Sequence, residues 1–297
     1  MGQTISIIEV GPRDGFQSVK CATIPTEEKI RIIDDIIASG VKHVEYTSFV
    51  SPKAIPQLAD AAEVTKSVLE RHKNIDLFAL VPNLRGAQNA YELGLRKVCY
   101  VVSLSTSHNK ANINRTHEQS LEAYKEIRNA YPDMEVVLDL ATTFGCPFEG
   151  KYHKEQEVVD FLKPYADAGL KQCVLCDTIG IADPIQVKTV IKALQAAYPE
   201  LVLGVHFHDT RGLGMSNTIA AIECGVTNVQ AALGGLGGCP FAPGASGNLS
   251  TEDVVWALNE MGYDTGVDFR KIVAAAKSQV QTITGNYSGH QIHIGEV

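Results

Sequence analysis

Two histidines that are separated by one residue give the strongest chemical signal in this sequence. His206 and His208 lie at the end of the apolar run Leu201–His208, which we predict to be a strand. Alternate residues of a strand point to the same face, so both imidazoles would share one face. Two neutral imidazoles and one carboxylate form a facial set of metal ligands that leaves positions open for a substrate. Such a pair also occurs as two ordinary surface or core histidines, so the metal interpretation needs further ligands nearby.

Asp14 and Asn248 are the candidates for those further ligands. Asp14 follows the first apolar run, Ile5–Val10, and Asn248 ends a glycine-rich segment. A carboxylate and an amide oxygen, added to two imidazoles, give a mixed nitrogen and oxygen set without a thiolate. This set suits Mg²⁺ or Mn²⁺ and could also accept Zn²⁺ or Co²⁺. The sequence therefore predicts a divalent-metal site formed by Asp14, His206, His208 and Asn248.

Three charged residues near these candidates could act in catalysis. Arg13 is a permanent cation beside Asp14, and it could stabilise a developing enolate oxygen or form a structural ion pair. Glu45 and Asp177 lie near the ends of two other predicted strands. Each could orient Arg13 or a metal-bound water, or could complete a buried hydrogen-bond network. We expect Arg13, Glu45 and Asp177 to belong to the catalytic group, with the structural alternatives open.

The segment 234–248 contains six glycines, two prolines and Cys239. So many backbone breakers predict a loop without helix or strand. Glycines at both ends would let the middle of the loop close over a site. Cys239 could be a nucleophile, an acid or an inert thiol, and its accessible position between glycines favours a chemical role.

Eight apolar runs alternate with amphipathic stretches along the chain. Runs rich in Val, Ile and Leu without alternation are typical of strands buried on both faces of a parallel sheet. Eight strand–helix units predict an α/β fold, a (β/α)8 TIM barrel forming a single domain over residues 1–297. An open six-stranded sheet with an added domain is the alternative. The predicted strands are Ile5–Val10, His43–Phe49, Asp76–Val81, Lys97–Ser103, Glu135–Ala141, Gln172–Asp177, Leu201–His208 and Asn228–Leu233.

The predicted helices fill the intervals between these strands. Extra C-terminal helices, from about residue 250, are expected to pack on the barrel, and the polar tail Asn286–Val297 is expected to be loosely held. A TIM barrel has its active site at the carboxyl ends of its strands, which is where the candidate residues fall. The helices are Thr26–Ser39, Leu58–His72, Leu84–Leu93, His117–Ala130, Lys154–Ala168, Pro184–Ala197, Met215–Cys224, Thr251–Met261 and Phe269–Thr284.

Composition excludes several classes of partner. The formal net charge of -8 gives no general attraction to nucleic acid or to anionic membranes. No stretch of about 20 apolar residues is present, so we expect no membrane span. Seven scattered cysteines suit reduced thiols better than a disulfide framework, which favours a cytoplasmic location.

Several motifs together carry a resemblance to a known family. They are Glu9–Gln17 (EVGPRDGFQ), Asp177–Gly180 (DTIG), His206–Thr210 (HFHDT) and Gly235–Val255 (GLGGCPFAPGASGNLSTEDVV). With these motifs the sequence resembles the metal-dependent TIM-barrel lyases and synthases, and within them the 3-hydroxy-3-methylglutaryl-CoA (HMG-CoA) lyases. The resemblance covers almost the whole chain. The cysteine loop is its most specific part, because the synthases and carboxyltransferases of the group lack it.

The resemblance implies a role for each candidate residue. Arg13 would stabilise the enolate of departing acetyl-CoA, and Cys239 would be an acid or base at the reacting carbon. Glu45 and Asp177 would belong to the supporting polar shell. The metal ligands would be Asp14, His206, His208 and Asn248.

The implied reaction is a retro-Claisen cleavage. HMG-CoA, or a related 3-hydroxyacyl-CoA, would give acetyl-CoA and a keto acid such as acetoacetate. The expected cofactor is Mg²⁺ or Mn²⁺, the expected partner is an acyl-CoA thioester, and the expected assembly is a homo-oligomer, a dimer or larger.

The sequence departs from the family pattern at positions that flank the substrate. These positions are Ser103–Thr106, Leu140–Gly145 and Ala54. The departures leave the acyl group open, with a citramalyl-CoA or a larger branched 3-hydroxyglutaryl-CoA as alternatives. A condensing synthase and a non-catalytic barrel are two further alternatives, and the second is disfavoured because all four ligand positions are filled.

Overall fold

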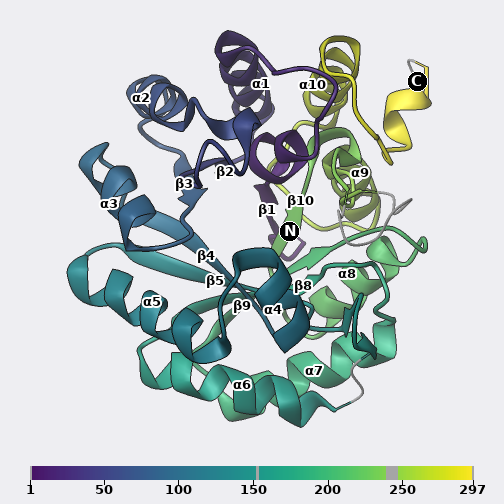
Figure 1. The fold of residues 1–297 in the computed structure, drawn as a ribbon. Coiled ribbons are helices and arrows are strands. Elements are labelled where there is room, and N and C mark those ends of the chain that lie inside the picture. Colours follow the sequence, from purple (N-terminus) through teal and green to yellow (C-terminus); the bar gives the residue numbers. More distant parts are fainter. Residues whose placement is uncertain (1, 152–153, 239–246, 296–297) are drawn as a thin grey trace.

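The fold is a closed parallel barrel. The structure, a computed structural model, describes residues 2–151, 154–238 and 247–295. Eight parallel strands close in the order β1-β10-β9-β8-β5-β4-β3-β2, and helices surround them (Figure 1). The predicted (β/α)8 barrel is confirmed, with every predicted strand present. The barrel strands are β1 (Ser6–Glu9), β2 (His43–Ser48), β3 (Asp76–Leu80), β4 (Lys97–Ser103), β5 (Glu135–Ala141), β8 (Gln172–Asp177), β9 (Val202–Phe207) and β10 (Asn228–Ala231).

The predicted helices are also present, with small shifts at their ends. The largest shift is at α2, which begins at Ala61 because Pro56–Leu58 form a separate 3-10 turn, η2. No helix of the described residues is long and apolar enough to cross a membrane. The helices around the barrel are α1 (Thr26–Ala38), α2 (Ala61–Arg71), α3 (Leu84–Glu92), α5 (His117–Ala130), α6 (Glu155–Asp167), α7 (Pro184–Ala197) and α8 (Gly214–Glu223).

The barrel interior has its own apolar layer, distinct from the core between strands and helices. Alternate residues of each strand face inward and fill a small barrel with side chains. This layer reaches the carboxyl ends of the strands, where Cys176 lies opposite His206 in the strand register. It is formed by Ile8, Val10, Phe78, Cys99, Val137, Val174, Cys176 and Ala232.

Several elements that the sequence did not predict follow soon after strands. A π-helix, η1 (Gly11–Gly15), follows β1, and helix α4 (Thr106–Ile113) follows β4. A short hairpin of β6 (Gly145–Cys146) and β7 (Gly150–Lys151) follows β5. Helix α4 has almost no amphipathic pattern, and its clearest signal is the N-cap, where the Ser105 hydroxyl accepts a hydrogen bond from the His108 amide.

The C-terminal part packs beside the barrel. Helices α9 (Thr251–Glu260) and α10 (Phe269–Thr282) follow β10, and α10 lies against α1 and α9 (Figure 1). The glycine-rich segment begins with a 3-10 turn, η3 (Leu233–Gly235), in a region predicted to lack helix. A second 3-10 turn, η4 (Gln291–His293), lies near the end of the chain.

The expectation of a loosely held tail is wrong for residues 288–291, which are hydrogen-bonded to other parts of the chain. The Ser288 hydroxyl donates to the Asn248 carbonyl at 2.8 Å, and the Gly289 amide donates to the Gly234 carbonyl at 3.0 Å. The His290 amide donates to Asp253 Oδ2 at 2.8 Å. A polar composition indicated a solvated tail, but the Ser288 hydroxyl and the backbone amides of residues 289–291 are paired with α9 and with the glycine-rich segment.

Candidate metal centre

The π-helix after β1 places Arg13 and Asp14 at the mouth of the barrel. The Asp14 amide donates to the Val10 carbonyl at 2.7 Å, so the chain turns tightly as soon as β1 ends. Isolated π-helical turns are rare and occur frequently at functional sites. The turn brings two adjacent charged side chains to one end of the barrel.

The buried carboxyl group of Glu9, at the end of β1, holds this turn in position through hydrogen bonds. Its Oε1 atom accepts hydrogen bonds from the Gly11 amide at 2.7 Å and from the Leu233 amide at 2.8 Å. Its Oε2 atom accepts one from the Thr251 hydroxyl at 2.6 Å. Burial raises the pKa of Glu9 to about 7, although these three hydrogen bonds act in the opposite direction. One buried carboxyl group therefore joins the ends of β1 and β10 to the start of α9.

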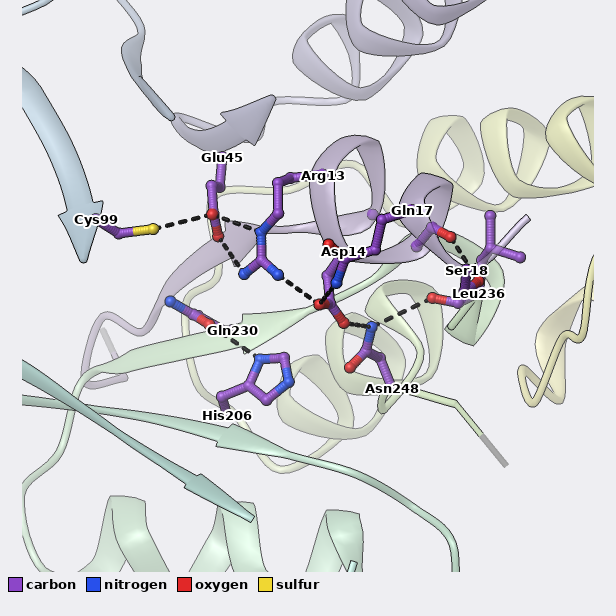
Figure 2. Close-up of polar contacts among 12 residues, drawn as sticks. Arg13, Asp14, Gln17, Ser18, Glu45, Cys99, His206, Gln230, Leu236 and Asn248 are labelled. Atoms are coloured by element: carbon purple, nitrogen blue, oxygen red, sulfur yellow. Dashed lines mark hydrogen bonds and ion pairs between the residues drawn. The ribbon is translucent and has the colours of Figure 1, made fainter. Parts of the chain in front are cut away.

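Arg13 lies between two carboxylates (Figure 2). Its Nε and Nη2 atoms donate to the two oxygens of Glu45 at 2.6 and 2.8 Å, and its Nη1 atom donates to Asp14 Oδ1. Burial favours the neutral form of Arg13, but Glu45 and Asp14 outweigh it and raise the pKa well above its ordinary value. The two-point pairing holds the plane of the guanidinium in one orientation, as fork-shaped arginine contacts do. Arg13 is thus a fixed cation beside Asp14.

Asp14, His206 and His208 converge at the carboxyl end of the barrel. Each offers one ligand atom, and these atoms all lie within 4.8 Å of one another. The two imidazole rings have centroids 5.2 Å apart, as expected for alternate positions on one face of a strand. Three of the four residues predicted as ligands therefore lie together, although Asp14 is far from the two histidines in the sequence.

The protonation states suit a cation. Burial lowers the pKa of His206 to about 4 and also lowers the pKa of His208, so both imidazoles are neutral near pH 7. Burial alone would raise the pKa of Asp14, but the adjacent Arg13 cation and the histidines lower it to about 2. Because the imidazoles are neutral near pH 7, Arg13 is the cation that keeps Asp14 ionised there.

Gln230 fixes the orientation of His206. Gln230 lies on β10 directly opposite His206 in the strand register, and its Oε1 atom is 2.9 Å from His206 Nδ1. An amide oxygen can only accept, so Nδ1 carries the proton and Nε2 keeps its lone pair. Gln230 was not among the residues predicted for the site. A buried glutamine within an apolar strand, beside a predicted histidine ligand, is the signal that could have found it.

Asn248 joins the group through its amide. Its Nδ2 atom donates to Asp14 Oδ2 at 2.8 Å and to the Leu236 carbonyl at 3.2 Å (Figure 2). Both contacts use the amide nitrogen, so the orientation leaves the Oδ1 atom available as a ligand. Among the described residues, neither Asn248 Oδ1 nor His208 Nδ1 has a hydrogen-bond partner, although both atoms are buried. A buried polar atom without a partner is costly, so this donor set fits a divalent cation.

Two predicted catalytic residues remain, and the structure describes Asp177 but not Cys239. The two oxygens of Asp177 accept hydrogen bonds from the Ile181 and Ala182 amides at 2.9 and 3.0 Å, which holds the loop after β8. Burial raises the pKa of Asp177, and His208 is close enough to act in the opposite direction. Asp177 makes no hydrogen bond to Arg13 or Asp14 within the described part of the chain. Cys239 lies outside the described residues.

A second buried cluster lies behind Arg13. Glu45, Cys99 and Asp139 place their polar atoms within 4.8 Å of one another, and the Cys99 thiol donates to Glu45 Oε1 at 3.0 Å. Burial and the Glu45 charge raise the pKa of Asp139 above its ordinary range. Glu45 therefore has Arg13 on one side and two protonated groups on the other. Cys99 and Asp139 were not predicted for the site, because a single polar residue inside an apolar run does not reveal its neighbours in the fold.

Comparison with known proteins agrees with this geometry. A sequence profile of the HMGL-like family matches residues 4–278. The chain belongs to the HMGL-like family. Hydroxymethylglutaryl-CoA lyase YngG of Bacillus subtilis is 42% identical over 275 residues, and the alignment covers 92% of this chain and 91% of that relative. The resemblance stated from the motifs is thereby confirmed.

Solved structures of HMGL-like proteins have the same fold. The crystal structure of the Bacillus subtilis HMG-CoA lyase superposes with a TM-score of 0.92 at 40% identity, covering 98% of both chains. An HMG-CoA lyase from Acinetobacter baumannii, solved in complex with coenzyme A and 3-methylmalate, gives a TM-score of 0.90 at 40% identity. That comparison covers 99% of this chain and 98% of the other.

Proposed function

We propose that this protein is a divalent-metal-dependent carbon–carbon lyase that cleaves HMG-CoA to acetyl-CoA and acetoacetate. The observation that carries the proposal is the convergence of Asp14, His206 and His208 beside the fixed Arg13 cation. Mg²⁺ or Mn²⁺ is the proposed ion, because the ligands are oxygen and imidazole atoms without a thiolate. When bound, the ion would act as a Lewis acid toward the substrate oxygens.

The electron flow in this reaction explains the position of Arg13. Loss of the proton from the substrate's 3-hydroxyl forms the ketone of acetoacetate and breaks the adjacent C–C bond. The electron pair of that bond moves to the thioester and gives the enolate of acetyl-CoA, which takes up a proton at carbon. Arg13 still has N–H groups beyond those paired with Glu45 and Asp14, and we assign them to the enolate oxygen.

Four further assignments complete the proposed site. Asn248 supplies the fourth ligand through Oδ1, and Cys239 is the acid or base at the reacting carbon. Glu45 orients Arg13. Asp177 has a supporting role, because its hydrogen bonds hold the loop after β8 next to His208.

The protein is also proposed to work in the cytoplasm as a homo-oligomer, a dimer or larger. The described cysteines are all free thiols, which supports a reducing compartment. Light scattering on the purified protein would test the assembly, and a monomer at micromolar concentration would contradict it.

Metal removal tests the main proposal. After treatment with EDTA, we expect acetyl-CoA release from HMG-CoA to stop and to return with Mg²⁺ or Mn²⁺. Full activity in a sample shown by elemental analysis to lack metal would contradict the metal requirement. Acetyl-CoA release from citramalyl-CoA but not from HMG-CoA would move the assignment to another substrate. A thiol assay distinguishes the lyase from the alternative, a condensing synthase, because the synthase would release free CoA when given acetyl-CoA and a keto acid.

A further inference from the structure

The chain after α10 contacts both ends of the glycine-rich segment. We name residues 287–291 the clasp, residues 234–237 the entry stem and residues 247–249 the exit stem. The Ser288 hydroxyl donates to the Asn248 carbonyl at 2.8 Å and lies 3.3 Å from the Gly235 carbonyl oxygen. The Gly289 amide donates to the Gly234 carbonyl at 3.0 Å. The clasp therefore joins the two stems, which are separated in sequence by the intervening loop.

The clasp is held firmly on the C-terminal helices. Asp253 on α9 accepts the His290 amide at 2.8 Å and the Gln291 amide at 3.0 Å. The Tyr287 hydroxyl donates to the Ile283 carbonyl, just beyond α10, at 2.8 Å. Because both ends of the clasp are anchored, Ser288 is a fixed point from which the stems can be positioned.

The contacts between stems and clasp leave no room for side chains. A Cβ atom on Gly235, which has a φ of +64°, would lie 2.1 Å from Ser288 Oγ. A Cβ on Gly237 would lie 2.8 Å from Asn248 Nδ2, and one on Gly247 would lie 2.6 Å from the Gly235 carbonyl oxygen. These glycines permit close backbone packing. The described stems form one packed layer with the clasp. The predicted closure of the middle of the loop concerns residues 239–246, which lie outside the described ranges.

A short path connects this layer to the candidate metal centre. Ser288 holds the main-chain carbonyl of Asn248, and the side chain of the same residue donates to Asp14 Oδ2 at 2.8 Å. The Leu236 carbonyl of the entry stem accepts the second hydrogen bond from that amide group. The direction of Asn248 Oδ1 thus depends on main-chain positions that the clasp fixes.

We infer that Ser288 is a positioning residue for the metal centre, and that the clasp holds Asn248 in the orientation that completes the ligand set. This inference rests on the proposed function, because it takes Asn248 as a ligand. Within the described part of the chain, the Ser288 hydroxyl makes no hydrogen bond to the proposed ligand atoms. It acts through the main chain of Asn248.

Binding of Mn²⁺ to the protein, measured by calorimetry without substrate, tests the inference. We expect Ser288→Ala to weaken Mn²⁺ binding about fivefold, the size expected for one lost hydrogen bond that orients a ligand. Ser288→Thr keeps the hydroxyl and should bind Mn²⁺ like the wild type. Ser278→Ala is the matched control. Ser278 is a half-buried serine on α10 whose hydroxyl accepts from Arg31, and its replacement should leave Mn²⁺ affinity unchanged.

Two more measurements separate failure of this inference from failure of the proposed function. Asn248→Ala should weaken Mn²⁺ binding at least as much as Ser288→Ala. If Asn248→Ala weakens binding and Ser288→Ala does not, the clasp has no positioning role and the metal site stands. If Asn248→Ala leaves Mn²⁺ affinity unchanged, the proposed ligand set is wrong. Amide hydrogen exchange in the metal-free protein should be faster in both stems of Ser288→Ala, and unchanged exchange there would also overturn the inference.

Discussion

At the scale of single residues, the site depends on how neighbouring groups fix the charge and orientation of each side chain. Arg13 is a cation whose position is set by Glu45, and Asp14 is an anion because Arg13 is beside it. His206 offers one defined nitrogen because Gln230 occupies the other. Residue types and spacing predicted the residues that converge at the site. They did not predict the residues that orient them, because the pairings of Arg13 with Glu45 and of His206 with Gln230 are set by the closed barrel.

Replacing Arg13 tests its assigned role at the enolate. We expect Arg13→Met to lower kcat by about 100-fold or more, with a smaller change in KM, because the contact would strengthen as negative charge develops. Steady-state kinetics with HMG-CoA would measure both values. Arg13→Lys keeps a charge but cannot pair with both oxygens of Glu45, so its kcat should lie between those of the wild type and Arg13→Met. A rise in KM with unchanged kcat would make Arg13 a substrate-binding residue instead.

Replacing Gln230 tests whether the orientation of His206 matters for the metal. Gln230→Leu removes the acceptor at Nδ1, so the ring can adopt the wrong tautomer or rotate. We expect Mn²⁺ affinity, measured by calorimetry, to fall about tenfold or more, as for other partners of metal ligands. The control is Gln195→Leu, on the exposed face of α7, where the Gln195 amide donates a hydrogen bond to the Cys224 carbonyl. Equal affinities of Gln230→Leu and wild type would show that the hydrogen bond has no effect on the ligand.

At the scale of elements, the strands were predictable and the turns after them were not. Buried parallel strands need continuous apolar runs, and those runs are visible in the sequence. The π-helix at Gly11–Gly15 begins where the Val10 carbonyl accepts a hydrogen bond from the Asp14 amide, and residue types do not reveal this contact. Helix α4 has almost no amphipathic pattern. The tail was predicted to be solvated because its sequence is polar. Its hydrogen-bond partners, Asp253 and the entry stem, are brought next to it only by the tertiary packing. The turns and short helices after the strands were therefore the hardest elements to predict, whereas β9, which carries His206, was predicted.

Glu9 shows how one side chain can hold three elements together. Thr251→Val keeps the shape of the side chain but removes the hydroxyl that Glu9 Oε2 accepts. We expect the free energy of unfolding to fall by about 1–3 kcal/mol, measured by urea unfolding. Thr189→Val on α7 is the control, because Thr189 is exposed and its hydroxyl donates to the Ile185 carbonyl of its own helix.

The decrease in the free energy of unfolding caused by Thr251→Val should also depend on pH. Burial raises the pKa of Glu9 to about 7, and the Thr251 hydrogen bond acts against that increase. Removing the hydroxyl raises the folded-state pKa further, so ionised Glu9 costs more in the variant. The destabilisation should be larger at pH 8 than at pH 5. An equal loss at both pH values would contradict the assigned role of the hydroxyl.

At the scale of the whole molecule, the barrel interior combines an apolar layer with a buried acidic cluster. Glu45 is paired with Arg13, and Asp139 lies close to Glu45 without a cation of its own. Its buried Oδ1 atom has no hydrogen-bond partner among the described residues. Burial, strengthened by the Glu45 charge, raises the pKa of Asp139, so the folded barrel holds a proton that the unfolded chain releases above about pH 4.

This difference in proton binding predicts how stability changes with pH. As the pH rises from about 4 toward the raised pKa, the Asp139 contribution to the free energy of unfolding should fall by up to about 1.4 kcal/mol per pH unit. Asp139→Asn cannot ionise, so the variant should gain stability relative to the wild type as the pH increases from 5 to 8. Urea unfolding of EDTA-treated samples would measure this gain without a contribution from metal binding. Asp133→Asn, which changes an exposed carboxylate, is the control, and its curve should run parallel to that of the wild type. Parallel curves for Asp139→Asn and wild type would mean that Asp139 is ionised in the folded barrel, and that the cluster behind Arg13 carries two negative charges.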